Sequence, residues 1–157
     1  ALAALAIDRP GLRTRLLDLY LHLRCYPEVP ETLRALRAAG RQLAILSNGT
    51  PAMLAAVVSE CGLGELFDAV LSVEEVGVFK PHPAVYRLAC DRLRVAPEAI
   101  CFLSSNAWDA YSAKAFGLRV VWCNRFGQAP ERIPSTPDAE ISDLSALPAM
   151  LLPARSG

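Results

Sequence analysis

Hydrophobic residues follow two alternating patterns along the chain, a helical spacing and short continuous runs. The helical spacing predicts helices, which we place at residues 10–23, 30–39, 50–58, 83–93, 107–116 and 144–151. The apolar runs predict strands at residues 42–46, 67–71, 99–103 and 118–123, with a last short element at 140–141. We expect the strand at 42–46 to be buried on both faces. Strands that alternate with helices predict an α/β fold, in which helices cover both faces of an open, largely parallel sheet.

The composition narrows the classes of partner. The chain has 157 residues, 53% of them hydrophobic, which is enough for one domain to bury a core without disulfide or metal. Its 16 basic and 16 acidic residues balance, which argues against a nucleic-acid surface or a basic membrane patch. No apolar run is long enough to span a membrane. Five widely spaced cysteines without a C-x-x-C pair predict reduced packing residues of a cytoplasmic protein.

Polar residues follow each of the first three predicted strands. Ser47, Asn48 and Gly49 come after the first strand, and Lys80 lies in the loop after the second. Residues 104–109, Ser-Ser-Asn-Ala-Trp-Asp, come after the third. Open parallel sheets bind ligands at the carboxyl ends of their strands, so these residues mark a candidate site.

Each cluster taken alone also fits an ordinary structural role. Residues 47–51 can form a strand–helix turn with an N-cap, and Lys80 can be a solvated lysine. Asp109 can stabilise the N-terminus of the following helix, and a tryptophan such as Trp108 is more often a core residue. His82, between two prolines, is expected to be exposed and is given no role. It is the succession of three clusters at three strand ends that favours a functional site.

The joint order and spacing of these motifs resemble the haloacid dehalogenase superfamily, and within it most closely the L-2-haloacid dehalogenases, also called (S)-2-haloacid dehalogenases. The resemblance rests on residues 46–49, on 78–81 with Tyr86, and on 104–109, with supporting segments at 26–30 and 122–125. It implies a Rossmann-type core and hydrolysis of small L-2-haloalkanoic acids to 2-hydroxy acids, without a cofactor. Phosphatases of the superfamily usually carry a second Asp in the last motif for Mg²⁺. Ser-Ser-Asn at 104–106 therefore favours a dehalogenase without metal.

The resemblance also implies roles for individual residues. An aspartate attacks the carbon that bears the halogen, and water then hydrolyses the resulting ester. Asp109 matches the carboxylate that activates this water, and Lys80 matches the lysine that keeps the nucleophile ionised. The other matches are Ser104 and Asn106, which position the carboxylates and the water; Ser47, which receives the substrate carboxylate; Asn48 and Trp108, which cradle the halide; and Tyr86, a tyrosine of the site without a clear role.

The nucleophile of this pattern has no clear counterpart. Its motif resembles Asp-x-x-Gly-Thr, and the one candidate, Asp8, follows a run of Ala and Leu that favours helix over strand. We therefore expect residues 1–24 to be the end of a helical cap domain and residues 25–157 to be the core domain, with the nucleophile upstream of Ala1. The 157 residues alone are then expected to be inactive, with an unpaired strand edge and an exposed helix stripe.

Two other interpretations remain open. A phosphatase-like member of the superfamily with an atypical metal loop would depend on Mg²⁺. A truncated product or interaction module would show no turnover at all. Members of the family often dimerise, so a homodimer is a further expectation drawn from the resemblance.

Overall fold

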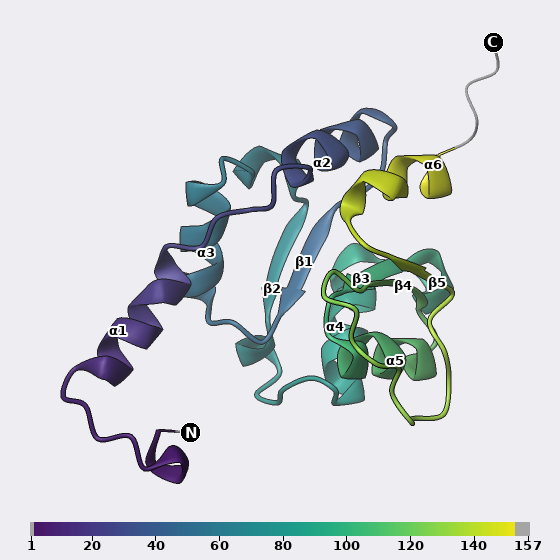
Figure 1. Cartoon of the computed structure of the whole chain (residues 1–157). Coiled ribbons are helices and arrows are strands. Elements are labelled where there is room, and N and C mark those ends of the chain that lie inside the picture. Colours follow the sequence, from purple (N-terminus) through teal and green to yellow (C-terminus); the bar gives the residue numbers. More distant parts are fainter. Residues whose placement is uncertain (1, 153–157) are drawn as a thin grey trace.

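The computed structural model describes residues 2–152 and contains helices and strands in regular alternation (Figure 1). The α-helices are α1 (Leu12–Asp18), α2 (Val29–Ala38), α3 (Pro51–Glu60), α4 (Pro83–Leu93), α5 (Ala107–Phe116) and α6 (Leu147–Leu151). The strands are β1 (Ala44–Ser47), β2 (Ala69–Ser72), β3 (Cys101–Ser104), β4 (Arg119–Cys123) and β5 (Ala139–Ile141). Short 3-10 turns lie at Ala3–Leu5, Leu19–Leu21, Gly64–Leu66, Val73–Glu75, Pro97–Ala99 and Leu144–Ala146. No described helix is both long and apolar enough to cross a bilayer.

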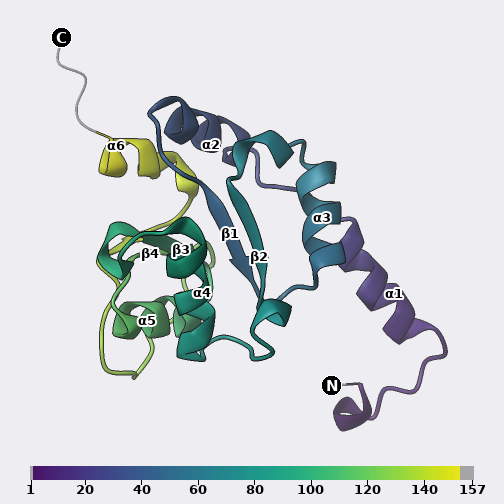
Figure 2. The ribbon, with the colours of Figure 1, turned by 180° about the vertical axis from the view of Figure 1, so that it is seen from behind.

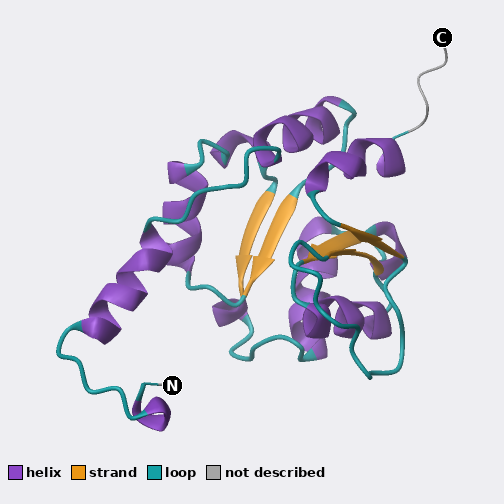
Figure 3. Cartoon of the chain, viewed as in Figure 1, coloured by secondary structure: helices purple, strands orange, loops and turns teal. Residues whose placement is uncertain are grey.

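The strands are parallel, as expected, but they form two sheets where we expected one (Figure 3). In the first sheet β1 pairs with β2, with Ala44 opposite Ala69 and Ser47 opposite Ser72. In the second sheet β4 lies between β3 and β5. Helix α4 contacts both strands of the first sheet and also packs on α5 beside the second sheet. The α/β class with parallel strands is therefore confirmed, and the break between β1 and β3 is the departure from expectation.

The main core lies between α4, α5 and the second sheet. Its buried members are Tyr86, Cys90, Ala107, Ala110, Tyr111, Ala113, Leu118, Val120 and Trp122. The Tyr86 ring meets Phe102 edge-on at 5.9 Å between centroids, a favoured geometry for aromatic pairs. Alanines on α5 let the helix approach the sheet closely, and Gly117, at φ 114°, ends it in the left-handed conformation. This core fixes the carboxyl end of β3 and the first turn of α5.

Strand β1 is less buried than its sequence predicts. We expected the run at 42–46 to be covered on both faces, but Ala44 is exposed, and Ile45 and Leu46 are half-buried. By contrast, Leu71 on the neighbouring β2 is fully buried. The difference arises because Ala44, Ile45 and Leu46 line the cavity between the two sheets, whereas Leu71 does not.

The amino-terminal segment forms a shorter helix than expected. The pattern at residues 10–23 predicts one helix, whereas the structure has α1 followed by the 3-10 turn Leu19–Leu21. Its leucines remain largely exposed, with Leu19 at 60% of its full accessibility, because the segment touches the rest of the molecule mainly through α3 (Figure 2). The exposed helix stripe expected from the sequence is thus present. The assignment of residues 1–24 to a cap domain stays a prediction.

A matched pair of leucine substitutions tests this distribution of packing. Leu71→Ala removes a side chain with no exposed surface and should lower the free energy of unfolding by about 2–5 kcal/mol. Leu19→Ala makes the same chemical change at an exposed position and should stay within about 0.5 kcal/mol of the unmodified chain. Urea titration followed by circular dichroism measures both. Equal losses from the two variants would contradict the assignment of Leu71 to the core.

Candidate functional site

The loops that follow β1, β2 and β3 meet at one end of the two sheets. The side-chain oxygen Oδ1 of Asn48 accepts a hydrogen bond from the backbone N–H of Lys80 at 3.0 Å. The Ser72 hydroxyl, at the end of β2, donates to the Gly49 carbonyl at 2.8 Å. Lys80 in turn reaches Asp109 on α5, just beyond β3. The expectation that polar residues after the strands gather at one edge is met, even though the strands belong to two sheets.

A buried ion pair lies at the centre of this cluster. The ammonium Nζ of Lys80 lies 3.1 Å from Oδ2 of Asp109, and the two side chains are 8% and 4% exposed. The ammonium also lies over the Phe102 ring, 4.7 Å from its centroid, where a cation–π attraction adds to the ion pair. Burial of this degree argues against a solvated Lys80. Removing one partner of such a pair leaves an uncompensated buried charge, which costs about 3–5 kcal/mol.

Asp109 accepts hydrogen bonds on both of its carboxylate oxygens. The Tyr86 hydroxyl donates to Oδ1 at 2.8 Å, and the Ser104 hydroxyl donates to Oδ2 at 2.9 Å beside Lys80. The backbone N–H of Asn106 donates to the Ser104 hydroxyl at 3.2 Å, which fixes that hydroxyl in turn. The carboxylate is therefore held in one orientation by donors from three separate segments. A helix-stabilising role for Asp109 in the first turn of α5 does not require these partners.

Burial changes the proton affinities of the two donors that can titrate. Removal of Lys80 from water lowers the pKa of its ammonium, and the Asp109 charge opposes that change only in part. Burial also raises the pKa of the Tyr86 hydroxyl, and the neighbouring Asp109 charge raises it further. Tyr86 therefore stays protonated and keeps donating to Asp109 through the neutral pH range.

The other predicted residues lie around this centre. The Ser47 hydroxyl accepts from the backbone N–H of Gly49 at 3.0 Å, which shapes the turn after β1. Asn106 holds Ser104 through its backbone, while its own side chain is exposed. Trp108 is 37% exposed, so the alternative that it is a core residue is wrong. The structure thus brings Lys80, Asp109, Tyr86 and Ser104 into direct contact and places the remaining four at the rim.

Two contributors were not singled out in the sequence. Phe102 stands in the apolar run of β3, and only its place two residues before Ser104 marks it as near the site. Ser72 ends β2 in register with Ser47, which is the one signal that could have found it. Both residues contribute through contacts with segments distant in the sequence, Phe102 with Lys80 and Ser72 with Gly49, and a single sequence does not reveal such contacts.

Asp8 lies elsewhere. It is exposed in the loop before α1, and that loop is well separated from the carboxyl ends of β1 and β2 (Figure 1). The segments at 26–30 and 122–125 meet each other, with Arg125 paired to Glu28 and stacked on the Tyr26 ring at 3.8 Å from its centroid. They join the start of α2 to the end of β4 and take no direct part in the Lys80–Asp109 cluster.

The donor set suits hydrogen bonding more than cation binding. Both oxygens of Asp109 already accept from side-chain donors, one of them a cation. Across residues 2–152, no three His, Cys, Asp or Glu side chains gather closely enough to hold a metal ion. The described site therefore offers one anchored carboxylate and one buried ammonium.

The buried ammonium can be observed directly, because Lys80 and Lys114 are the only lysines in the sequence. In a chain labelled with ¹⁵N-lysine, the Lys80 signal should titrate below the ordinary lysine pKa of about 10.4. The variant Lys114→Arg removes the other lysine signal, so the signal that remains is assigned to Lys80. A Lys80 midpoint at or above the ordinary value would show that the ion pair outweighs burial.

The contact between Tyr86 and Asp109 has its own test. Tyr86→Phe removes the donor to Oδ1 and leaves a buried carboxylate oxygen unsatisfied, so unfolding should become easier by about 1–3 kcal/mol. Tyr111→Phe is the matched control, since Tyr111 is a buried tyrosine of the same core whose hydroxyl does not bond to Asp109. Thermal denaturation of both variants should show the larger loss for Tyr86→Phe, and the reverse order would contradict the assignment.

Comparison with known proteins places this geometry in a family. A haloacid dehalogenase-like hydrolase model matches residues 7–117. A curated relative, (S)-2-haloacid dehalogenase 1 of Pseudomonas sp. (strain CBS-3), is 45% identical over 146 residues, which is 93% of this chain and 64% of that protein. This chain therefore spans less than two thirds of that relative's length.

Solved structures agree. An L-2-haloacid dehalogenase from Xanthobacter autotrophicus with chloropropionic acid covalently bound superposes with a TM-score of 0.85 at 33% identity, covering 95% of this chain and 70% of that one. A phosphatase of the superfamily from Thermococcus onnurineus superposes with a TM-score of 0.74 at 30% identity, covering 96% and 68%. The resemblance seen in the motifs is confirmed: this chain belongs to the haloacid dehalogenase-like hydrolase family.

Proposed function

We propose that the protein hydrolyses small L-2-haloalkanoic acids to 2-hydroxy acids. The observation that carries the proposal is the buried Lys80–Asp109 pair, with Tyr86 and Ser104 holding the carboxylate. Such a cluster provides an oriented base next to a fixed positive charge in a site shielded from water. The high identity to dehalogenases supports this activity over others of the family.

The reaction has two steps. A carboxylate displaces the halide at C2, so that a carbon–oxygen bond forms as the carbon–halogen bond breaks, and an ester results. Water then attacks the ester carbonyl while Asp109 accepts its proton. As the carbonyl–oxygen bond to the substrate breaks, Asp109 passes that proton to the departing C2 oxygen, so the 2-hydroxy acid leaves; the enzyme carboxyl group then loses its own proton to solvent and the carboxylate is restored. Lys80 keeps the attacking carboxylate ionised until the displacement, in which its negative charge passes to the departing halide.

Asp109 is the one carboxylate that touches Lys80 among residues 2–152, and it is assigned to the second step. The first step requires another carboxylate within reach of the Lys80 ammonium. The exposed position of Asp8, away from the strand ends, does not supply it. We therefore propose that the nucleophile comes from polypeptide outside these residues, and that the 157-residue chain alone does not turn over.

The rim residues take the substrate. Ser47 and the N-terminus of α3 suit the substrate carboxylate, because the positive end of a helix dipole favours an anion. Asn48 and the exposed Trp108 offer an amide donor and a ring edge for the departing halide. Asn106 and Ser104 are proposed to position the carboxylates and the attacking water.

A phosphatase remains the second candidate, favoured by the structural similarity to a phosphatase of the superfamily. The arrangement of Asp109 argues for the dehalogenase, since its oxygens are taken by Lys80, Tyr86 and Ser104.

Chloride release from L-2-chloropropionate in the presence of EDTA tests the proposal, using both the 157-residue chain and the product of the full reading frame that contains it. Release should occur with the full product and not with the 157 residues. In the full product, Asp109→Asn should lower kcat by about 10²–10⁴-fold, because the water loses its base. Asp91→Asn, the same change on the exposed surface of α4, should leave kcat unaltered.

Other results would each overturn a specific part. Mg²⁺-dependent release of phosphate from p-nitrophenyl phosphate without chloride release would establish the phosphatase. Chloride release by the 157 residues alone would place the nucleophile among them. If the full product released neither chloride nor phosphate, the protein would have neither activity.

A further inference from the structure

The fold brings together two cysteines that lie far apart in the sequence. Cys25 lies in the chain between the 3-10 turn Leu19–Leu21 and α2, and Cys61 directly follows the last residue of α3. The Cys61 sulfur lies close to both the thiol and the backbone N–H of Cys25. Both residues are half-buried free thiols. The sequence predicts five separate packing cysteines, so the pairing of these two is revealed only by the fold.

Each cysteine is anchored on its own side of this contact. The backbone N–H of Cys61 donates to the Val57 carbonyl at 3.0 Å, which fixes Cys61 at the end of α3. Next to Cys25, the Tyr26 ring lies under the Arg125 guanidinium, 3.8 Å from ring centroid to guanidinium carbon. Because both segments are anchored, the two sulfur atoms stay near each other, and such closeness is the first requirement for a disulfide.

The contact lies where the amino-terminal segment joins the rest of the molecule. The chain between α1 and α2 runs along α3 (Figure 1, Figure 2), and the turn Leu19–Leu21 packs on that helix. Residues 1–24 are the segment predicted to end a cap domain, so Cys25 stands at the predicted domain boundary. A covalent bond from Cys25 to Cys61 would reinforce the main contact that this segment makes.

We propose that Cys25 and Cys61 form a redox-sensitive latch, a reversible disulfide that fastens the amino-terminal segment to α3 when a small-molecule disulfide acts as oxidant. One cysteine thiolate attacks a sulfur of the oxidant, so that a mixed disulfide forms and a small thiolate leaves. The other cysteine loses its proton and attacks the mixed disulfide, and a second small thiolate leaves. Two protein thiols are thus oxidised to one disulfide, and the oxidant is reduced to two thiols that take up the two protons.

The surroundings of Cys61 assign the order of the two attacks. Burial raises the pKa of the Cys61 thiol, and the neighbouring Cys25 raises it further. Because the thiolate is the attacking species, Cys61 is a slow first nucleophile at neutral pH. Cys25 therefore makes the first attack on the oxidant, and Cys61 completes the bond.

The latch goes beyond the proposed function, since it requires neither substrate nor the Lys80–Asp109 pair. The disulfide closes a loop that contains α2, β1 and α3, and such a loop restricts the unfolded chain. Oxidation should therefore raise the midpoint of thermal unfolding by about 5 °C or more. It should also slow backbone amide exchange at residues 19–25 by about threefold or more, because local opening of the segment becomes harder.

The test equilibrates the 157-residue chain with oxidised glutathione, alkylates the remaining thiols and maps the tryptic peptides by mass spectrometry. A monomeric product with Cys25 joined to Cys61 is expected, and dithiothreitol should reverse it. This mapping uses the unmodified chain, so it does not depend on whether any variant folds. Both cysteines recovered as free thiols, as glutathione adducts or in disulfides between two copies would overturn the proposal.

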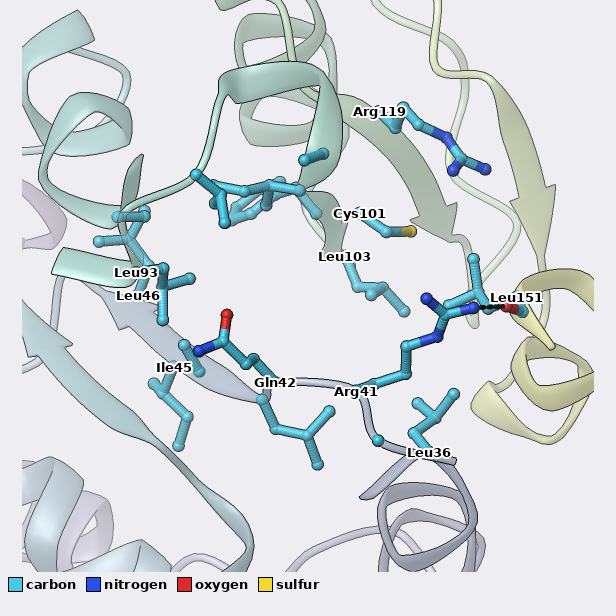
Figure 4. A pocket seen from close by; sticks show the side chains of 18 residues that line it. Leu36, Arg41, Gln42, Ile45, Leu46, Leu93, Cys101, Leu103, Arg119 and Leu151 are labelled. Carbon is cyan, nitrogen blue, oxygen red and sulfur yellow. Dashed lines mark hydrogen bonds between the residues drawn. The ribbon is translucent and has the colours of Figure 1, made fainter. Parts of the chain in front are cut away.

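Cysteine variants test what the bond does. Cys25→Ser and Cys61→Ser should each abolish the effect of oxidation on the thermal midpoint and on amide exchange. Cys101→Ser is the matched control, because Cys101 is also half-buried but lies on β3, where it lines the cavity between the two sheets (Figure 4). This control should keep the full response to oxidation. A mapped disulfide that changes neither the midpoint nor the exchange of residues 19–25 would overturn the fastening of the segment.

The order of attack has a separate readout in the same variants. Cys61→Ser should accumulate a glutathione adduct on Cys25, because the second attack is then blocked. Cys25→Ser should gain its adduct on Cys61 more slowly, by about threefold or more at neutral pH. Equal rates for the two adducts, or faster reaction of Cys61, would overturn the assigned order.

Discussion

The candidate site depends on one buried ion pair between Lys80 and Asp109. Two charges withdrawn from water are tolerated only when each finds enough partners to replace its hydration. Asp109 has three side-chain donors, and the Lys80 ammonium has one carboxylate and the face of Phe102. Because Lys80 has fewer partners than Asp109, the loss of hydration on burial outweighs the ion pair, and the pKa of the Lys80 ammonium is lowered. The lysine is short of negative charge, and this shortage is what a second carboxylate would correct.

The members of this cluster come from separate segments of the chain, and the fold brings them together. Lys80 stands in a loop held to β1 through Asn48, Tyr86 comes from α4, and Ser104 ends β3. The buried core between α4, α5 and the second sheet holds these segments in fixed relative positions. Charged and polar groups placed on rigid elements in this way need little reorganisation when charge develops nearby.

The sequence was sufficient for the order of helices and strands, because glycine, proline and apolar runs mark most boundaries within two or three residues. It also pointed to the strand ends, where Lys80, Ser104 and Asp109 do converge. It could not show the break in the sheet, because strand pairing is set by contacts between distant segments. Ile45 is half-buried because of that break, so the local hydrophobic pattern could not predict its exposure. The exposure of Trp108 could not be predicted for the same reason, since it depends on which face of α5 packs against the second sheet.

The unequal packing of the two sheets has a consequence for how the molecule opens. The second sheet with α4 and α5 contains the contiguous core, whereas β1 is half-exposed along its length. Cooperative units of a protein open with free energies that follow their buried contacts. We expect the half that contains β1, β2 and α3 to loosen first, while the β3–α5–β4 unit persists. Asn48 belongs to the first half and Asp109 to the second, so a partial opening would separate the rim of the site from its charged centre without unfolding the core.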